Sequence, residues 1–325
     1  MKKNRIFSLI LAVLMIVTLS TAWAGYPEKP IELIVPFDAG GSTDLAARVL
    51  ASVIPTYLGQ PVVVINKKGG GGLIGMNYVQ KAKPDGYTMM EATIGPLTIY
   101  PALHKKSPFS YKDFKAVART EVVSAVLVAR PDKRWKDLKG LAEFLKGNPG
   151  KLKIAIAGPA SLSDLGMKSF LAAAGIPIEN AIGVPFSGTA EALAAVLGKH
   201  ADILYANLTP CFDHIKAGNL VALGTSTEKR LKSLPDVPTF TELGYPEANV
   251  MGWKGVVGHG NLPDDIVKIW GDAIQKTMKN KAWTNLQNKL GSIPAYLGSS
   301  DFAAYMESQF NGFRKIAIDN NLLTD

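Results

Sequence analysis

The sequence has few of the residues that build disulfides, metal sites and membrane spans, and each shortage excludes a class of protein. Cys211 is the only cysteine, so the chain forms no internal disulfide and has no cysteine near its N-terminus to carry a lipid. His104, His200, His214 and His259 stand far apart and form no HExxH pattern, so we expect no metal site and no cofactor. The longest apolar run, Ile6 to Leu19, is about 14 residues and falls short of the roughly 20 that span a bilayer.

That apolar run has the features of a cleavable export signal. Three basic residues precede it, and Ala22-Trp23-Ala24 supplies the small-x-small pattern that a signal peptidase recognises. We therefore expect cleavage after Ala24, a mature chain that begins at Gly25, and a periplasmic location.

The charge of the mature chain is modest. Removing residues 1–24 lowers the formal net charge from +9 to +6, and the remaining lysines and arginines are scattered among acidic residues. A nucleic-acid partner is not expected, because such proteins gather their positive charge on one stripe. About 300 residues of 47% hydrophobic composition favour two cores over one.

Short apolar runs alternate with segments of helical period, which predicts an α/β fold with parallel strands. We expect strands at 31–35, 62–65, 87–92, 152–157, 183–186, 201–205 and 220–225. From Asp264 onward the pattern is almost wholly helical and ends in an amphipathic stretch from Asp301 to about Ile318.

Four strand-to-helix corners are rich in glycine and small polar residues: Ala39 to Thr43, Gly69 to Gly72, Ala160 to Ser163, and Ser187 to Thr189. A helix that begins at such a corner points free N–H groups and a positive dipole end outward, and it binds anions without a cationic side chain. The alternative is a set of tight turns with ordinary helix caps. Val-Pro-Phe precedes two of the corners, at 35–37 and 184–186, and hints at two similar lobes.

Catalytic patterns are sparse. Gly70-x-Gly72-x-x-Gly75 matches a dinucleotide-binding fingerprint, but only Glu91 could serve as the ribose-binding acid, and it falls within an expected strand. A hydrolase that uses Ser161 or Ser163 with a distant histidine stays open as the enzyme alternative.

The chain resembles the substrate-binding proteins of tripartite tricarboxylate transporters, the Bordetella uptake gene family, along nearly its whole mature length. The motifs that carry the resemblance are Tyr26-Pro27-x-Lys29-Pro30, Val35-Pro36-Phe37-x-Ala39-Gly40-Gly41-x-x-Asp44, Asn66-Lys67-Lys68-Gly69-Gly70-Gly71-Gly72-x-x-Gly75, Lys83-Pro84-Asp85-Gly86-Tyr87-Thr88, Val184-Pro185-Phe186-x-Gly188, His214-Ile215-Lys216-Ala217-Gly218 and Pro235-Asp236-Val237-Pro238-Thr239.

This resemblance implies a two-lobed periplasmic binding fold of type II, with a ligand cleft between the lobes. The chain would cross between lobes near residues 121–126 and 244–252. We expect lobe 1 to comprise residues 25–123 and 248–325, and lobe 2 residues 124–247. A monomer is expected.

The resemblance also implies which residues hold the ligand. In lobe 1 they would be Phe37, Ala39, Gly40, Gly41, Ser42, Gly70, Gly71 and Thr93; in lobe 2 we expect Ser161, Ser163, Ser187, Gly188, Thr189 and Asn207. Asp44 and Asp164 are expected to brace their loops.

One position departs from the family pattern in a way that bears on the ligand. Relatives often have Gly-x-Gly-Ser-x-x-His where this chain has Gly158-Pro159-Ala160-Ser161-Leu162-Ser163-Asp164. A carboxylate at Asp164 would disfavour a second ligand carboxylate, which predicts a ligand with one carboxylate and a neutral or donor-bearing far end. The alternative is that Asp164 is an ordinary capping residue.

Taken together, the residues and the resemblance predict a periplasmic solute-binding protein, not an enzyme, that delivers a small organic carboxylate to membrane transporter subunits. A ligand sensor that docks on a receptor is the alternative from a different class.

Overall fold

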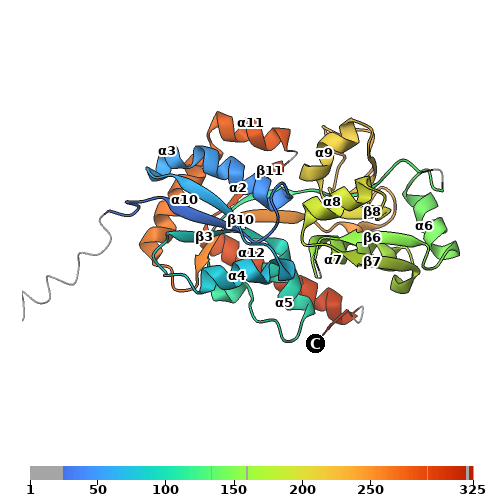
Figure 1. The fold of residues 1–325 in the computed structure, drawn as a ribbon, viewed down its shortest axis with the longest axis horizontal. Coiled ribbons are helices and arrows are strands. Elements are labelled where there is room, and N and C mark those ends of the chain that lie inside the picture. The colour runs from blue at the N-terminus through green and yellow to red at the C-terminus, as the bar shows by residue number, and fades with distance from the viewer. Residues whose placement is uncertain (1–24, 133, 159, 291, 320–321, 325) are drawn as a thin grey trace, which may run out of the picture.

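The chain folds around two separate β-sheets, one in each of two lobes (Figure 1). The computed structural model describes residues 25–132, 134–158, 160–290, 292–319 and 322–324. The expected export signal, residues 1–24, lies outside the described residues. Within the described ranges, no helix is both long enough and apolar enough to cross a membrane.

The first sheet has six strands in the order β11-β4-β10-β3-β1-β2. β1 is parallel to β2 and to β3, whereas β10 runs antiparallel to β3 and β4, and β11 runs antiparallel to β4. The strands are β1 (Ile31–Val35), β2 (Val62–Asn66), β3 (Thr88–Thr93), β4 (Phe114–Val123), β10 (Gly252–His259) and β11 (Ser292–Leu297).

The second sheet has five strands in the order β7-β6-β8-β5-β9. β6 is parallel to β7 and β8, and β5 is antiparallel to β8 and β9. The strands are β5 (Ala125–Ala129), β6 (Leu152–Ile156), β7 (Ala181–Pro185), β8 (Ile203–Asn207) and β9 (Val221–Thr225).

The two sheets repeat one topology. The order β2-β1-β3-β10 in the first corresponds to β7-β6-β8-β5 in the second, with three parallel strands and one antiparallel strand in each. β1 therefore corresponds to β6, and β2 to β7. The Val-Pro-Phe repeat does not follow this relation, because its first copy lies at the end of β1 and its second at the end of β7, and these two strands are not equivalent.

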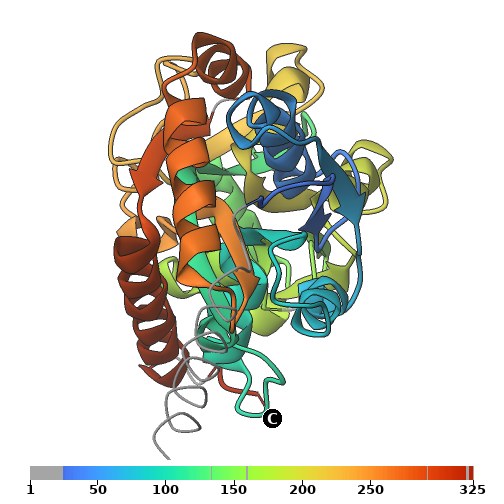
Figure 2. The same ribbon diagram turned by 90° about the vertical axis from the view of Figure 1, so that its left-hand side faces the viewer.

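Helices cover both faces of each sheet, and Figure 2 views the first lobe with α10 in front. The helices are α2 (Ser42–Val53), α3 (Pro55–Leu58), α4 (Leu73–Gln80), α5 (Tyr100–Leu103), α6 (Leu138–Gly147), α7 (Leu162–Ala173), α8 (Thr189–Leu197), α9 (Leu208–Lys216), α10 (Asp264–Met278), α11 (Lys281–Lys289) and α12 (Ser299–Asp319). Single turns η1 (Gly70–Gly72), η2 (Gly95–Ile99), η3 (Tyr111–Asp113), η4 (Ile178–Asn180) and η5 (Pro246–Ala248) connect them.

The apolar core runs through both lobes. One cluster of buried side chains continues from Trp253 and Phe302 of the first lobe to Phe170 and Tyr205 of the second. Each sheet has a second cluster on its other face, where α10 covers the first sheet and α8 and α9 cover the second. The sheets are thus the middle layers of two α/β/α sandwiches, and one buried apolar cluster continues from one sandwich to the other.

Three strands of the first sheet, β4, β10 and β11, and β5 of the second sheet were not expected from the sequence. Residues after Asp264 are not wholly helical, because β11 separates α11 from α12. β11 contains Pro294 and lies at the edge of the sheet, the position at which a strand tolerates a missing N–H donor. β4 was not expected because Arg119 and Glu121 interrupt its apolar pattern.

The chain passes from the first sheet to the second at Ser124, between β4 and β5, and returns between β9 and β10. At the return, the Tyr205 hydroxyl lies 2.7 Å from the Ala248 carbonyl oxygen and 2.9 Å from that of Val250. Tyr205 is fully buried. One tyrosine of the second sheet therefore holds the crossing segment in place.

Tyr205→Phe should lower the free energy of unfolding by about 1–3 kcal/mol, because it removes the hydroxyl proton that the two buried carbonyl groups share, and the Val250 carbonyl group loses its donor. Urea unfolding followed by circular dichroism measures the change. Tyr296→Phe, at a tyrosine 36% exposed, is the matched control and should stay within about 0.5 kcal/mol of the wild type. Equal stability of the two variants would contradict a holding role for the Tyr205 hydroxyl.

Candidate functional site

The four expected corners lie at the carboxyl ends of parallel strands, where they form two equivalent pairs. α2 follows β1 as α7 follows β6, and η1 with α4 follows β2 as α8 follows β7. The first N–H groups of each helix have no partner within the helix. The starts of α2 and α7 both contribute to one cavity between the lobes.

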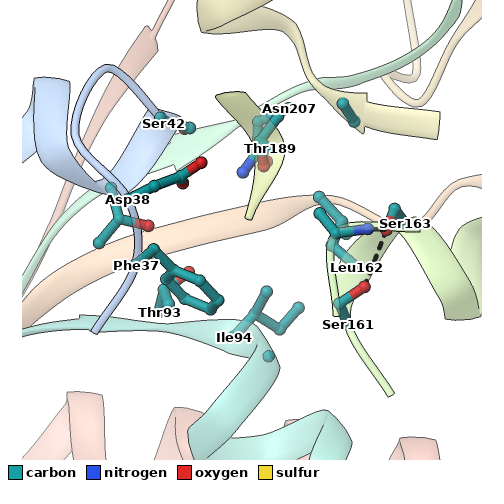
Figure 3. Close-up of a pocket in the computed structure, with 15 residues that line it drawn as sticks. Phe37, Asp38, Ser42, Thr93, Ile94, Ser161, Leu162, Ser163, Thr189 and Asn207 are labelled. Atoms are coloured by element: carbon teal, nitrogen blue, oxygen red, sulfur yellow. Dashed lines mark hydrogen bonds between the residues drawn. The ribbon is translucent and has the colours of Figure 1, made fainter. Parts of the chain in front are cut away.

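This cavity contains about 480 Å³ of space not filled by protein atoms, part of it open to solvent. Figure 3 shows the two lobes facing each other across it. The first lobe lines it with the turn before α2 and the end of β3, and the second with the starts of α7 and α8 and the end of β8. The lining residues are Phe37, Asp38, Gly41, Ser42, Thr43, Thr93, Ile94, Gly95, Ala157, Ser161, Leu162, Ser163, Thr189, Ala206 and Asn207.

Among these described lining residues there is no lysine or arginine, and Asp38 is the one charged side chain. The polar groups that remain are hydroxyls, one amide and the main-chain N–H groups of the helix starts. Such a lining attracts an anion through dipoles and hydrogen bonds and not through a cationic partner.

Two aspartates hold equivalent loops in the two lobes. Asp44, in the first turn of α2, accepts hydrogen bonds from the Gly40 N–H (2.9 Å) and from Arg48 (2.9 Å). Asp164, in the first turn of α7, accepts from the Ala160 N–H (3.1 Å) and from Lys168 (2.9 Å). Each carboxylate thus joins a backbone N–H four residues before it to a basic side chain four residues after it.

The carboxylate of Asp44 has a further donor, the Asn66 side chain at 3.0 Å. Burial opposes ionisation of Asp44, but the hydrogen bonds from Arg48, Gly40 and Asn66 outweigh it and lower the pKa of Asp44 below its ordinary value. Neither Asp44 nor Asp164 lines the cavity.

The hydroxyls at the start of α7 are linked to one another. The Ser161 and Ser163 hydroxyl oxygens are 2.8 Å apart, as the dashed line in Figure 3 marks. Ser163 Oγ accepts from the Ala157 N–H at 2.7 Å, and Ser161 Oγ accepts from the Asp164 N–H at 3.3 Å. No histidine lines the cavity in the described part of the chain, so the geometry does not assemble the hydrolase alternative around these serines.

The fourth expected corner, at the start of α8 in the second lobe, is closed by a residue of the first lobe. Asp38 Oδ2 accepts a hydrogen bond from the Glu191 N–H of α8 at 3.1 Å, and Figure 3 shows its carboxylate pointing across the cavity toward Thr189 and Asn207. The N-cap residue of α8, Gly188, has no side chain to cap the helix. Burial of the Asp38 carboxylate raises its pKa, an effect that the Glu191 N–H partly offsets.

Other contacts also join the lobes beside the cavity. Lys68 pairs with the Glu191 carboxylate at 2.7 Å, and the same carboxylate accepts from the Ser187 N–H at 3.2 Å. Hydrogen bonds from Lys68 and Ser187 lower the pKa of Glu191 to about 2. A Cβ added to Gly158 would lie 3.3 Å from Gly71 Cα of the opposite lobe. The structure therefore has the lobes in contact.

Of the ligand contacts expected from the sequence, the cavity brings together eight: Phe37, Gly41, Ser42, Thr93, Ser161, Ser163, Thr189 and Asn207. The other six do not line it. Ala39 and Gly40 are exposed on the turn before α2, and Gly70, Gly71, Ser187 and Gly188 flank the cavity where the lobes meet. Asp38 was not among the expected residues, because the motif Val35-Pro36-Phe37-x-Ala39 leaves its position unspecified.

Comparison with known proteins agrees with this geometry. The model of the tripartite tricarboxylate transporter family receptor matches residues 46–322. The chain belongs to this receptor family. Its relatives include Protein BugT of Bordetella pertussis (strain Tohama I / ATCC BAA-589 / NCTC 13251), which is 33% identical over 83% of this chain and 82% of the relative.

Solved structures of receptor-family proteins share the two-lobed fold. The periplasmic binding protein BugD is 30% identical with a TM-score of 0.87, and the match covers 92% of this chain and all of BugD. MatC from Rhodopseudomonas palustris, solved with bound malate, is 26% identical with a TM-score of 0.84, covering 90% of this chain and 99% of MatC. The family and the fold class expected from the sequence are confirmed.

Proposed function

We propose that this chain captures a small organic carboxylate in the periplasm and delivers it to the membrane subunits of a tripartite tricarboxylate transporter. The observation that carries the proposal is the pair of helix starts, α2 and α7, that face one cavity whose described lining offers hydroxyls and amides and contains no basic side chain. MatC, which has the same fold, holds malate. Family membership supports the transporter as the partner.

The affinity available from such a lining is sufficient for capture. Hydrogen bonds to a charged group are each worth about 1.5–3 kcal/mol. A few of them reach the roughly 8 kcal/mol that corresponds to micromolar binding. Closure of the lobes over the ligand would then shift the population toward the form in which Asp38 and Lys68 contact α8.

Location and lobe boundaries belong to the same proposal. Cleavage after Ala24 would free the mature chain in the periplasm. Lobe 1 would comprise residues 25–123 and 248–325, and lobe 2 residues 124–247; the crossings before β5 and before β10 support these boundaries.

Thermal unfolding of the mature protein in the presence of carboxylic acids tests the proposal. A ligand at 100 times its dissociation constant should add about 2.7 kcal/mol to the free energy of unfolding. The acid should be recovered unchanged by NMR, since the family consists of binding proteins. Conversion of the acid would indicate an enzyme, and a screen in which amines or sugars stabilise the protein but no carboxylate does would refute the proposal.

A further inference from the structure

Asp38 is a buried carboxylate that belongs to the first lobe but occupies the start of a helix in the second. Its side chain is 6% exposed, and Oδ2 accepts the Glu191 N–H of the nine-residue helix α8. Its other oxygen, Oδ1, is also buried and has no hydrogen-bond partner among the described residues. Asp38 therefore fills one anion-attracting corner and offers a free acceptor beside the ligand cavity.

Lys68 is the cation that acts on Asp38 among the described residues, and its charge is already shared with Glu191. The cavity lining contains no lysine or arginine among the described residues. The Lys68 ammonium is committed to Glu191 at 2.7 Å, on a side chain that is half exposed. A ligand carboxylate placed near Asp38 would meet a like charge in a partly desolvated site, which is unfavourable.

The starts of α2 and α7 remain available to a ligand, whereas α8 is occupied by Asp38. The acidic residue that the sequence singled out, Asp164, does not perform this role, because its carboxylate is engaged by Ala160 and Lys168 and lies outside the cavity lining. Asp38, and not Asp164, is therefore the residue that disfavours a second ligand carboxylate.

We infer that the ligand is a carboxylate that also carries an ammonium group, and that this ammonium donates to Asp38 Oδ1. The inference rests on the proposed function and narrows its ligand class from carboxylates in general to amino acids in the chemical sense. Asp38 is then both a specificity residue and the group that closes the lobes on the correct ligand. A hydroxyl in place of the ammonium could donate the same bond without the charge.

Calorimetry with two sets of matched acids tests the inference. The four-carbon set is butanoate, succinate, 4-aminobutanoate and 2-aminobutanoate, and the six-carbon set is hexanoate, adipate, 6-aminohexanoate and 2-aminohexanoate. At one chain length at least, an amino acid should bind the wild type about tenfold or more tightly than the diacid, as expected for a hydrogen bond between charged groups. The affinities of the hydroxyl analogues, 4-hydroxybutanoate and 6-hydroxyhexanoate, should fall between those of the amino acid and the diacid of the same length.

Asp38→Asn should weaken binding of the amino acid about tenfold to hundredfold. It should also reduce or reverse the preference of the protein for the amino acid over the diacid. Lys68→Ala is the matched control, because it removes the other contact to α8 without changing the charge of the cavity lining. Lys68→Ala should weaken binding of the amino acid and of the diacid by the same factor. Asp38→Ala and the melting temperature of each variant show whether a loss reflects misfolding.

The outcomes separate this inference from the proposed function. Tighter binding of the diacid by the wild type at both lengths, or an equal effect of Asp38→Asn on both ligand types, would overturn the inference and leave carboxylate binding intact. Absence of binding by every acid of both sets, with a folded protein, would overturn both for short aliphatic acids.

Discussion

Replacing Gly188 with valine should weaken ligand binding at least about tenfold while leaving each lobe folded. A Cβ at position 188 would lie 2.0 Å from Asp38 Oδ1 and 2.7 Å from Asp38 Cγ, much closer than atoms can pack. The clash is with the opposite lobe, so it acts on the closed form and not on the open one. The backbone of Gly188 is extended and accepts a side chain without strain. Loss of a helix cap of this kind costs about 0.5–2 kcal/mol before the clash is added.

Calorimetry with an acid that binds the wild type measures the loss of affinity in Gly188→Val. Gly312→Ala is the control, because an added Cβ there meets nothing within 4 Å. The clash should also be relieved by removing its partner: in the Asp38→Ala background, Gly188→Val should cost less than in the wild type. Wild-type affinity in Gly188→Val, or equal costs in both backgrounds, would show that the lobes do not close through this contact.

The sequence sufficed for the parts of the site that local chemistry determines. Small residues after a strand specify a corner wherever it lies in the fold, and all four expected corners lie at strand ends. Ala160 illustrates how strongly the corner shape is imposed. It adopts a left-handed φ of 48°, although an L-residue in that region costs about 1–2 kcal/mol.

The remaining features depend on contacts between distant segments. Glu191 is 153 positions from Asp38, and nothing in the local pattern of Asp38 indicates that it caps a helix of the other lobe. The buried charges of β4 and β10 were hidden for the same reason: Glu121 and Lys254 are polar in sequence but face each other across two paired strands. A hydrophobic pattern cannot predict that two charged residues from distant segments are buried on neighbouring strands.

Lys254 lies at the centre of that buried charge cluster, close to the point at which the chain leaves the second lobe. It stands opposite Glu121 on β4, and Glu91 lies on the adjacent strand β3, opposite Val256. The exposed fractions of the three side chains are 0% to 1%. Burial lowers the pKa of Lys254, and the two carboxylates oppose that shift. Burial likewise raises the pKa of Glu121 to about 7 and that of Glu91 well above its ordinary range.

These shifts give the wild type a pH dependence of definite sign. The pKa of Glu121 is higher in the folded state than its ordinary value of 4.5 in the unfolded chain, so the folded state holds its proton more tightly. The free energy of unfolding should therefore fall as the pH rises from about 4.5 to about 7. Glu91 contributes in the same direction.

Lys254→Met should lower the free energy of unfolding at pH 8 by about 3–5 kcal/mol, because it leaves two buried carboxylates without a cation. The loss should be much smaller at pH 5, where both carboxyl groups can be protonated in the folded protein. Urea unfolding at the two pH values measures the difference.

Lys268→Met is the control, since that lysine is 75% exposed and pairs with Asp272 on the surface of α10. This substitution should change the free energy of unfolding by less than about 1 kcal/mol. Adding Glu121→Gln to Lys254→Met should recover part of the stability at pH 8, because one buried negative charge is then removed. A loss at pH 5 as large as that at pH 8 would mean that Lys254 contributes through the packing of its methylene chain and not through its charge.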